Sequence, residues 1–289
     1  MNTIRHLSQY ALQELKDSYC EHEIHCICKI IYMDVLHFTN IDIHLRKNEI
    51  LDESFVNKFS EIIYLLKSGH PLQYILGETE FSGLRFRLNR STLIPRPETA
   101  ELVNWVHDFL VSGQNLLDIG CGSGCISISL SHLCPGANIT GIDINPEAVR
   151  TAKENAALNR VNTTFWVRDI LNFKTQDWEL YDLIVSNPPY IRESEKETME
   201  SKVLDYEPHQ ALFVPDTEPL LFYHKIAEFG LIYLKKNGLL FLEINEALGP
   251  ETISLLSQYG YQNIELRKDF LGKDRMIKCQ LTPSSTSNR

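Results

Sequence analysis

The stretch Asn115-Leu-Leu-Asp-Ile-Gly-Cys-Gly-Ser-Gly124 decides the fold class of this chain of 289 residues. It begins as an apolar strand, continues through glycines at positions 120, 122 and 124, and leads into an apolar helix that starts at Cys125. Glycines allow a tight turn and a close ligand approach, and the N-terminus of the helix presents unpaired N–H groups. This order of strand, glycine turn and helix is typical of a nucleotide-binding α/β domain.

The spacing of the glycines limits the kind of nucleotide. It is G-x-G-x-G, and Cys125 stands where a dinucleotide-binding loop has its third glycine, so a nicotinamide cofactor is disfavoured. Asp143 ends the next apolar run, where a carboxylate accepts both ribose hydroxyls. Asp169 and Ile170 follow the third run and are expected beside an adenine. The predicted cofactor-binding residues are Asp118, Gly120, Cys121, Gly122, Ser123, Gly124, Asp143, Asp169, Ile170 and Asn187.

Further apolar runs alternate with helical stretches along the C-terminal part of the chain. The alternation predicts a doubly wound α/β domain over residues 97–281. Residues 191–218 form a long charged connection, and a connection of that length is usually functional. Residues 282–289 are predicted to be a flexible tail. The predicted strands are Leu116–Ile119, Ile139–Ile144, Phe165–Val167, Leu183–Val185 and Leu239–Ile244.

The N-terminal part has a different pattern. Residues 3–17 and 52–67 carry apolar side chains at helical spacing, and Asp52 is a suitable N-cap for the second helix. We therefore expect a small helical domain over residues 1–75. A linker at 76–96 is predicted to hold a β-hairpin, with strands Glu78–Phe81 and Leu84–Leu88 around a Ser-Gly turn.

Composition and charge disfavour several classes of protein. The net charge of −10 disfavours binding of nucleic acid through its phosphates, which requires a surplus of basic side chains. An uninterrupted apolar run long enough to cross a membrane is absent from the sequence. Seven cysteines, an odd number, suit a reducing compartment. We expect a cytoplasmic monomer that needs neither a membrane nor nucleic acid.

The chemical motif is Asn187-Pro188-Pro189-Tyr190, which follows the strand at 183–185. An amide or aromatic amino nitrogen is a poor nucleophile because its lone pair is delocalised. The Asn187 side-chain oxygen and the Pro188 carbonyl are two acceptors on a rigid turn, and together they could hold both N–H bonds of one NH2 group. Tyr190 is expected to stack on the planar target. These four residues are the predicted catalytic residues of a methyltransferase that uses S-adenosylmethionine.

The motif indicates the class of nitrogen that is methylated but does not identify the substrate, because methyltransferases of adenine N6, of guanine N2 and of protein glutamine share it. A non-catalytic protein that binds the cofactor is a further alternative, although a scaffold has no need of both acceptors and a stacking ring.

Several segments together resemble the peptide chain release factor glutamine N5-methyltransferases, the HemK/PrmC family, over nearly the whole chain. They include the glycine loop, the Asn187–Tyr190 motif and Asp274-Arg275. The remaining segments are Pro71-Leu-Gln-Tyr-Ile-Leu-Gly77 with Phe81, Leu93-Ile-Pro-Arg-Pro-Glu-Thr99, and Tyr206-Glu-Pro208 with Ala211-Leu212.

The resemblance implies a seven-stranded Rossmann-like methyltransferase domain. It also implies that the substrate is the glutamine of a release factor's Gly-Gly-Gln motif and that the helical domain recognises that factor. Arg96 and Glu98 would then join Asn187, Pro188, Pro189 and Tyr190 as substrate-binding residues. Two departures stand out, Ala100 in place of an acidic residue and Glu243-Ile-Asn-Glu246 in place of Glu-x-Gly, and both are expected outside the chemistry.

Other residues have competing interpretations. The cluster Cys20, His22, His25, Cys26 and Cys28 has a poor spacing for zinc, and we expect free thiols and no metal. Cys121 and Cys125 flank the glycine loop without a supporting base, so small-residue packing explains them. Arg85, Arg87, Arg90 and Arg96 form either a positive patch or a solvated hairpin face.

Overall fold

The computed structural model describes residues 2–281, in which the chain folds as two compact units. The first unit runs to Gly77 and also contains Glu200–Tyr206; the second comprises Glu78–Met199 and the residues from Glu207 onward. The predicted tail at 282–289 lies outside the described residues. Within residues 2–281, no helix is long and apolar enough to cross a membrane.

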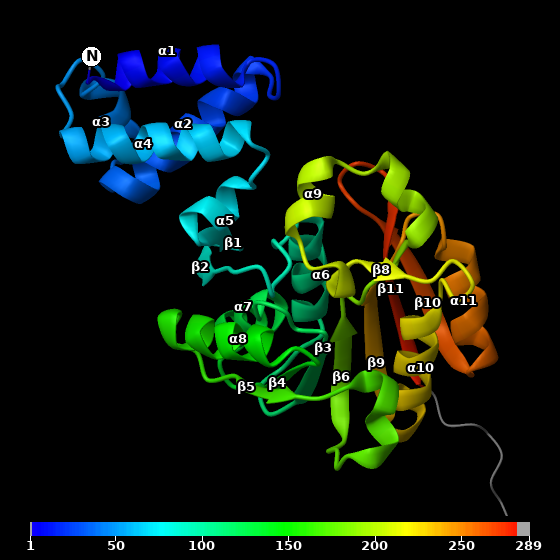
Figure 1. Cartoon of the computed structure of the whole chain (residues 1–289). Helices are drawn as coiled ribbons and strands as arrows, with labels where there is room; N and C mark the ends of the chain where they lie inside the picture. The colour runs from blue at the N-terminus through cyan, green and yellow to red at the C-terminus, as the bar shows by residue number, and fades with distance from the viewer. Residues whose placement is uncertain (1, 282–289) are drawn as a thin grey trace, which may run out of the picture. The chain divides into compact units, whose positions relative to one another are not determined.

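The first unit is helical, as the spacing of its apolar residues predicts (Figure 1). Asp52 caps α4 by accepting a hydrogen bond of 2.8 Å from the Ser54 N–H. Tyr32 stacks on Phe59 with 5.5 Å between ring centroids, inside an apolar core to which α1, α2, α4 and α5 contribute. The helices are α1 (Ile4–Leu15), α2 (Glu21–Leu36), α3 (Asn40–Leu45), α4 (Glu53–Lys67) and α5 (Leu72–Leu76).

The second unit begins with the predicted hairpin, β1 (Glu78–Phe81) and β2 (Leu84–Arg87). Its turn residues Ser82 and Gly83 both have positive φ, which is the conformation of a type I′ turn. The rest of the unit is a seven-stranded sheet in the order β10-β11-β9-β6-β3-β4-β5. The strands are β3 (Asn115–Ile119), β4 (Asn138–Asp143), β5 (Thr164–Val167), β6 (Tyr181–Ser186), β9 (Leu234–Glu243), β10 (Tyr261–Lys268) and β11 (Asp274–Leu281).

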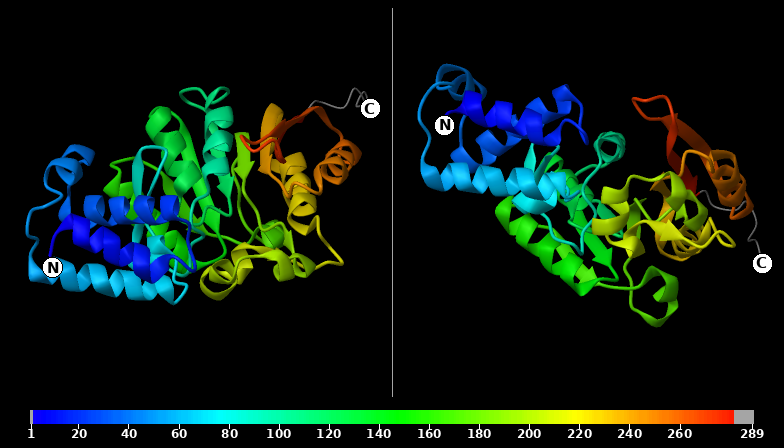
Figure 2. Two further views of the ribbon diagram at one scale, coloured as in Figure 1. Left: turned by 90° about the horizontal axis from the view of Figure 1, so that it is seen from above. Right: turned by 45° about the horizontal axis from the view of Figure 1, so that its top comes forward.

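Five neighbouring strands of the sheet, from β9 to β5, are parallel, and β10 and β11 are antiparallel. Alternate residues of a strand face opposite sides, so Leu116 belongs to one apolar core and Leu117 to the other. Helices cover both faces (Figure 2). They are α6 (Pro97–His107), α7 (Cys125–Leu133) and α8 (Pro146–Leu158) on one face, and α10 (Leu221–Tyr233) and α11 (Gly249–Gln258) on the other. The predicted doubly wound, Rossmann-like fold is confirmed.

The long connection predicted at 191–218 is divided into short elements. Strands β7 (Ile191–Arg192) and β8 (Phe213–Val214) pair in parallel and bring its two ends together. Between them lie η2 (Glu193–Thr198), α9 (Ser201–Tyr206) and η3 (His209–Ala211). Helix α9 belongs to the first unit, where the Tyr206 hydroxyl donates to the Ser68 carbonyl at 3.3 Å. The domain limits drawn from the sequence stay a prediction.

Candidate active site

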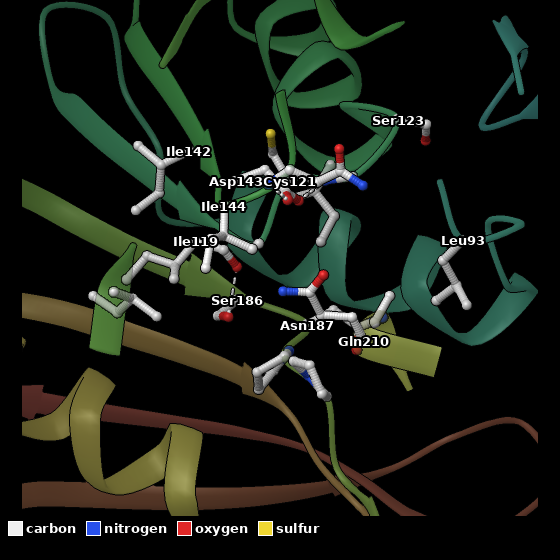
Figure 3. A pocket seen from close by; sticks show the side chains of 18 of the residues that line it. Leu93, Ile119, Cys121, Ser123, Ile142, Asp143, Ile144, Ser186, Asn187 and Gln210 are labelled. Carbon is white, nitrogen blue, oxygen red and sulfur yellow. Dashed lines mark hydrogen bonds between the residues drawn. The ribbon is translucent and has the colours of Figure 1, made fainter. Parts of the chain in front are cut away.

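Most of the predicted site residues lie at one edge of the sheet, where the parallel strands have their carboxyl ends. Parallel strands end on the same side, so the residues after β3, β4, β5 and β6 lie together. The chain runs outward from β3 in both directions, which makes this edge a topological switch point, where ligands bind. An open cavity of about 1180 Å³ lies there, lined by residues of the second unit alone (Figure 3).

The glycine loop forms one wall of the cavity, to which Gly120, Cys121, Gly122 and Ser123 contribute. Gly124 lies behind this wall. Its φ is +82°, and a Cβ added to it would come within 2.9 Å of Ile128 Cδ1. Only glycine therefore fits the start of α7.

Asp118 also lies behind the wall and is fully buried. One carboxylate oxygen, Oδ2, accepts hydrogen bonds from the Ser127 N–H at 3.2 Å and from the Ser127 hydroxyl. The other, Oδ1, has no protein partner among the described residues. Burial raises the pKa of Asp118 to about 7. Asp118 thus ties β3 to the start of α7, and any role in cofactor binding acts through the loop.

Asp143 and Asp169 both lie on the cavity wall. Asp143 accepts hydrogen bonds of 2.9 Å from the Gly122 and Asn145 N–H groups, and burial raises its pKa. Asp169 accepts from the Leu171 N–H at 2.8 Å and so caps η1 (Ile170–Thr175). The chain segments that carry the two carboxylates also add apolar side chains to the wall, those of Ile142, Ile144, Ile170 and Leu171.

The motif at the end of β6 forms another part of the cavity wall, next to the start of the glycine loop. Asn187, Pro188 and Pro189 line it, and the Asn187 side chain points into it (Figure 3). Asn187 Nδ2 donates to Thr99 Oγ1 at 3.3 Å. Ser186, just before the motif, donates to the Ile119 carbonyl at 2.7 Å, which ties β6 to β3. The strand tip is therefore firmly held where the sequence predicts it.

Tyr190 differs from its predicted position. It is absent from the cavity wall, and its hydroxyl donates to Glu243 Oε1 at 3.1 Å. Burial raises the pKa of Tyr190 well above its usual value. A buried phenol needs a hydrogen-bond partner, which Glu243 supplies, so the ring packs against the core instead of offering a face to the cavity.

Glu243 ends β9, is 1% exposed and receives a second hydrogen bond, from Thr99 Oγ1 to Oε2 at 2.8 Å. Burial raises its pKa, whereas the hydrogen bonds from Thr99 and Tyr190 and the charge on Arg275 oppose that rise. Asn245 Nδ2 donates to the Tyr190 carbonyl at 3.1 Å. Residues 243–246 are not part of the cavity wall, but Glu243 and Asn245 hold Tyr190 of the motif directly. Ala100, the other departure, packs at the border of a core.

Arg96 lines the cavity, and its Nη2 lies 2.5 Å from Oε1 of the buried Glu207. Glu98, in the first turn of α6, is half-buried and is not part of the wall. The residue-by-residue prediction missed several lining residues that sit within the segments quoted for the resemblance, which was the available signal: Leu93, Pro95, Thr99, Pro208 and Ala211. Gln210 and Phe222 carried no such signal.

Comparison with known proteins decides the family. Residues 6–77 match the model described as the PrmC N-terminal domain, and residues 99–206 match the methyltransferase small domain. The release factor glutamine methyltransferase of Flavobacterium psychrophilum is 45% identical, over 92% of this chain and 95% of its own. The protein of that name from Bacteroides thetaiotaomicron is 41% identical, over 94% and 98%. The chain belongs to the release factor glutamine methyltransferase family.

A solved structure supports the fold of this family member. A methyltransferase from Pyrococcus furiosus, 16% identical, aligns with a TM-score of 0.52 over 80% of this chain and all of its own. At that identity the likeness concerns the fold alone.

The remaining candidate residues have structural roles. Burial raises the pKa of Cys125 to about 12, so its thiol is not ionised near neutral pH. Arg85 and Arg87 pair with Glu78 and Glu154, which fits a hairpin face better than a bare positive patch. Cys28 is buried in the helical core, whereas Cys26 is exposed beside His22.

Proposed function

We propose that this chain transfers a methyl group from S-adenosylmethionine to the side-chain amide nitrogen of the glutamine in a release factor's Gly-Gly-Gln motif. The names of the relatives support the substrate. One structural observation carries the chemistry: the acceptors of Asn187 and Pro188 share a cavity with the glycine loop. Methyl transfer needs donor and nitrogen side by side, and one cavity provides that proximity.

The residues present fit the cofactor. Gly120 and Gly122 leave room for a ligand against the loop backbone. Asp143 supplies a carboxylate for ribose hydroxyls, and Ile142 and Ile170 supply an apolar slot for a flat base. When bound, the cofactor supplies an electrophilic methyl group on a sulfonium.

The chain's own residues then hold the nucleophile. Asn187 Oδ1 and the Pro188 carbonyl accept hydrogen bonds from the two N–H groups of the glutamine amide. These hydrogen bonds orient the amide nitrogen and draw electron density onto it. A strong base is not needed, because the methylated nitrogen becomes acidic and loses its proton to water. Arg96, fixed by Glu207, lines the side of the cavity near the substrate.

Labelled cofactor tests the proposal. The purified chain is incubated with a release factor, with the same factor after substitution of the Gly-Gly-Gln glutamine by glutamate, with RNA or with DNA. We expect label only in the unaltered factor. Label confined to nucleic acid would instead support an adenine or guanine methyltransferase, and cofactor binding without any transfer would support a scaffold.

The variant Asn187→Ala tests the mechanism. We expect it to bind the cofactor normally and to transfer methyl about a hundredfold more slowly, since the amide is no longer positioned. An unchanged rate would contradict the assigned role. The proposed location is the cytoplasm, where release factors act; the monomeric state stays a prediction.

A further inference from the structure

The orientation of the Asn187 amide decides whether the site can work. Its side chain has an acceptor at one end, Oδ1, and a donor at the other, Nδ2. A glutamine NH2 group offers only donors. If Asn187 turned by 180° about its last bond, its own NH2 would meet that of the target, and the substrate would lose an acceptor. The proposed function therefore requires a device that holds one of the two orientations.

The hydrogen bonds that link Asn187 to Thr99 and Thr99 to Glu243 can hold the amide in one orientation. The Thr99 hydroxyl carries a single proton, and it donates this proton to Glu243 Oε2 at 2.8 Å. Thr99 Oγ1 therefore presents only lone pairs to Asn187, and the group that meets it is Nδ2, at 3.3 Å. The reversed amide would bring two oxygens together without a proton between them.

Glu243 is the final acceptor in this series of hydrogen bonds. It is 1% exposed, and its Oε1 accepts from the Tyr190 hydroxyl at 3.1 Å. Burial raises the pKa of Glu243, and the two hydrogen bonds together with the charge on Arg275, which is bound to Asp269 at 3.0 Å, oppose that rise. Because both oxygens of Glu243 accept a hydrogen bond, donation runs from Asn187 through Thr99 to Glu243.

We propose that Thr99 and Glu243 are positioning residues that lock the Asn187 amide with its oxygen toward the reacting nitrogen. This role rests on the proposed function, since only an incoming NH2 group makes the orientation matter. Neither residue touches the reacting atoms through the contacts described; both act through Asn187.

The test compares Thr99→Val, which keeps the shape but lacks the hydroxyl, with Thr99→Ser, which keeps the hydroxyl. We expect kcat for release factor methylation to fall roughly ten- to a hundredfold in T99V, with cofactor affinity unchanged, and to stay near that of the unchanged chain in T99S. The matched control is Thr252→Val. Thr252 is also buried, and its hydroxyl donates to the carbonyl of Leu248, the residue before α11, at 2.7 Å, so kcat should not change.

A double-mutant cycle separates positioning from stability. In the Asn187→Ala background, Thr99→Val should cause no further loss of kcat, because there is no amide left to orient. Losses that multiply, or a T99V enzyme with full kcat, would overturn the positioning role and leave the proposed function standing. If the unchanged chain fails to methylate the release factor while binding the cofactor, both fall.

Discussion

At the scale of single residues, Asp118 is a carboxyl group in a place where its charge is costly. Its folded pKa of about 7 lies above the value of about 4 in an unfolded chain. Between these values the folded state binds more protons than the unfolded state, so the free energy of unfolding falls as the pH rises. The contribution of the neutral acid is complete below about pH 4 and is lost through about pH 7.

We expect Asp118→Asn to remove this pH dependence, because the amide cannot ionise. The free energy of unfolding of the unchanged chain relative to this variant should decline by up to about 4 kcal/mol from pH 4 to pH 8, measured by urea denaturation without cofactor. Asp177→Asn, an exposed carboxyl of the same unit, is the control. Parallel pH curves for the unchanged chain and D118N would contradict the burial effect.

At the scale of elements, the turn from β3 to α7 depends on close packing. Gly124 and Gly122 both have positive φ, so an alanine at either position suffers backbone strain of about 1–2 kcal/mol. Only at Gly124 would the new Cβ also crowd neighbours, with Ala152 Cβ and Phe165 Cζ at 3.2 Å. We expect Gly124→Ala to lower the free energy of unfolding by about 1–3 kcal/mol more than Gly122→Ala does.

Urea denaturation of the two glycine variants measures that difference. Equal losses at both positions would show that the strand, helix and ring around Gly124 can move apart at no cost, contrary to the close packing described here.

The elements also show why the sequence predicted part of the fold. The central strands, such as β6 with Ile184 in one core and Val185 in the other, are buried on both faces and read as continuous apolar runs. Strands β10 and β11 carry exposed or half-exposed charges, among them Arg267 and Lys278, and their alternation was not recognised as strand. Leu281, at the end of β11, pairs with Tyr261.

The site residues also fall into two groups, those that a local sequence pattern predicts and those that only the fold brings together. Residues consecutive in sequence, the glycine loop and Asn187 to Pro189, were predicted because each motif carries its own chemistry. Thr99 and Glu243 are 144 positions apart, and no local sequence pattern predicts the hydrogen bond between them. They meet because α6, which carries Thr99, packs against β9, where the ring centroids of Trp105 and Phe241 lie 5.5 Å apart.

At the scale of the whole molecule, the two units divide the labour that we propose. Each has its own apolar core, and the cavity is lined by the second unit alone. None of the described residues of the helical unit is part of the cavity wall. We propose that this unit recognises the release factor.

Deletion of residues 1–77 tests this division. The deletion removes the residues on which α9 packs, so folding is checked by circular dichroism. Because every lining residue and both cores of the second unit remain, we expect cofactor affinity to be unchanged. Methylation of a short peptide containing Gly-Gly-Gln should proceed as with the full chain, since only the cavity engages it. The kcat/KM for the intact factor should fall at least about tenfold, the effect of losing a modest 1.4 kcal/mol of binding. A truncated chain that methylates the intact factor as efficiently as the full chain would remove recognition from the helical unit and assign it to the surface around the cavity.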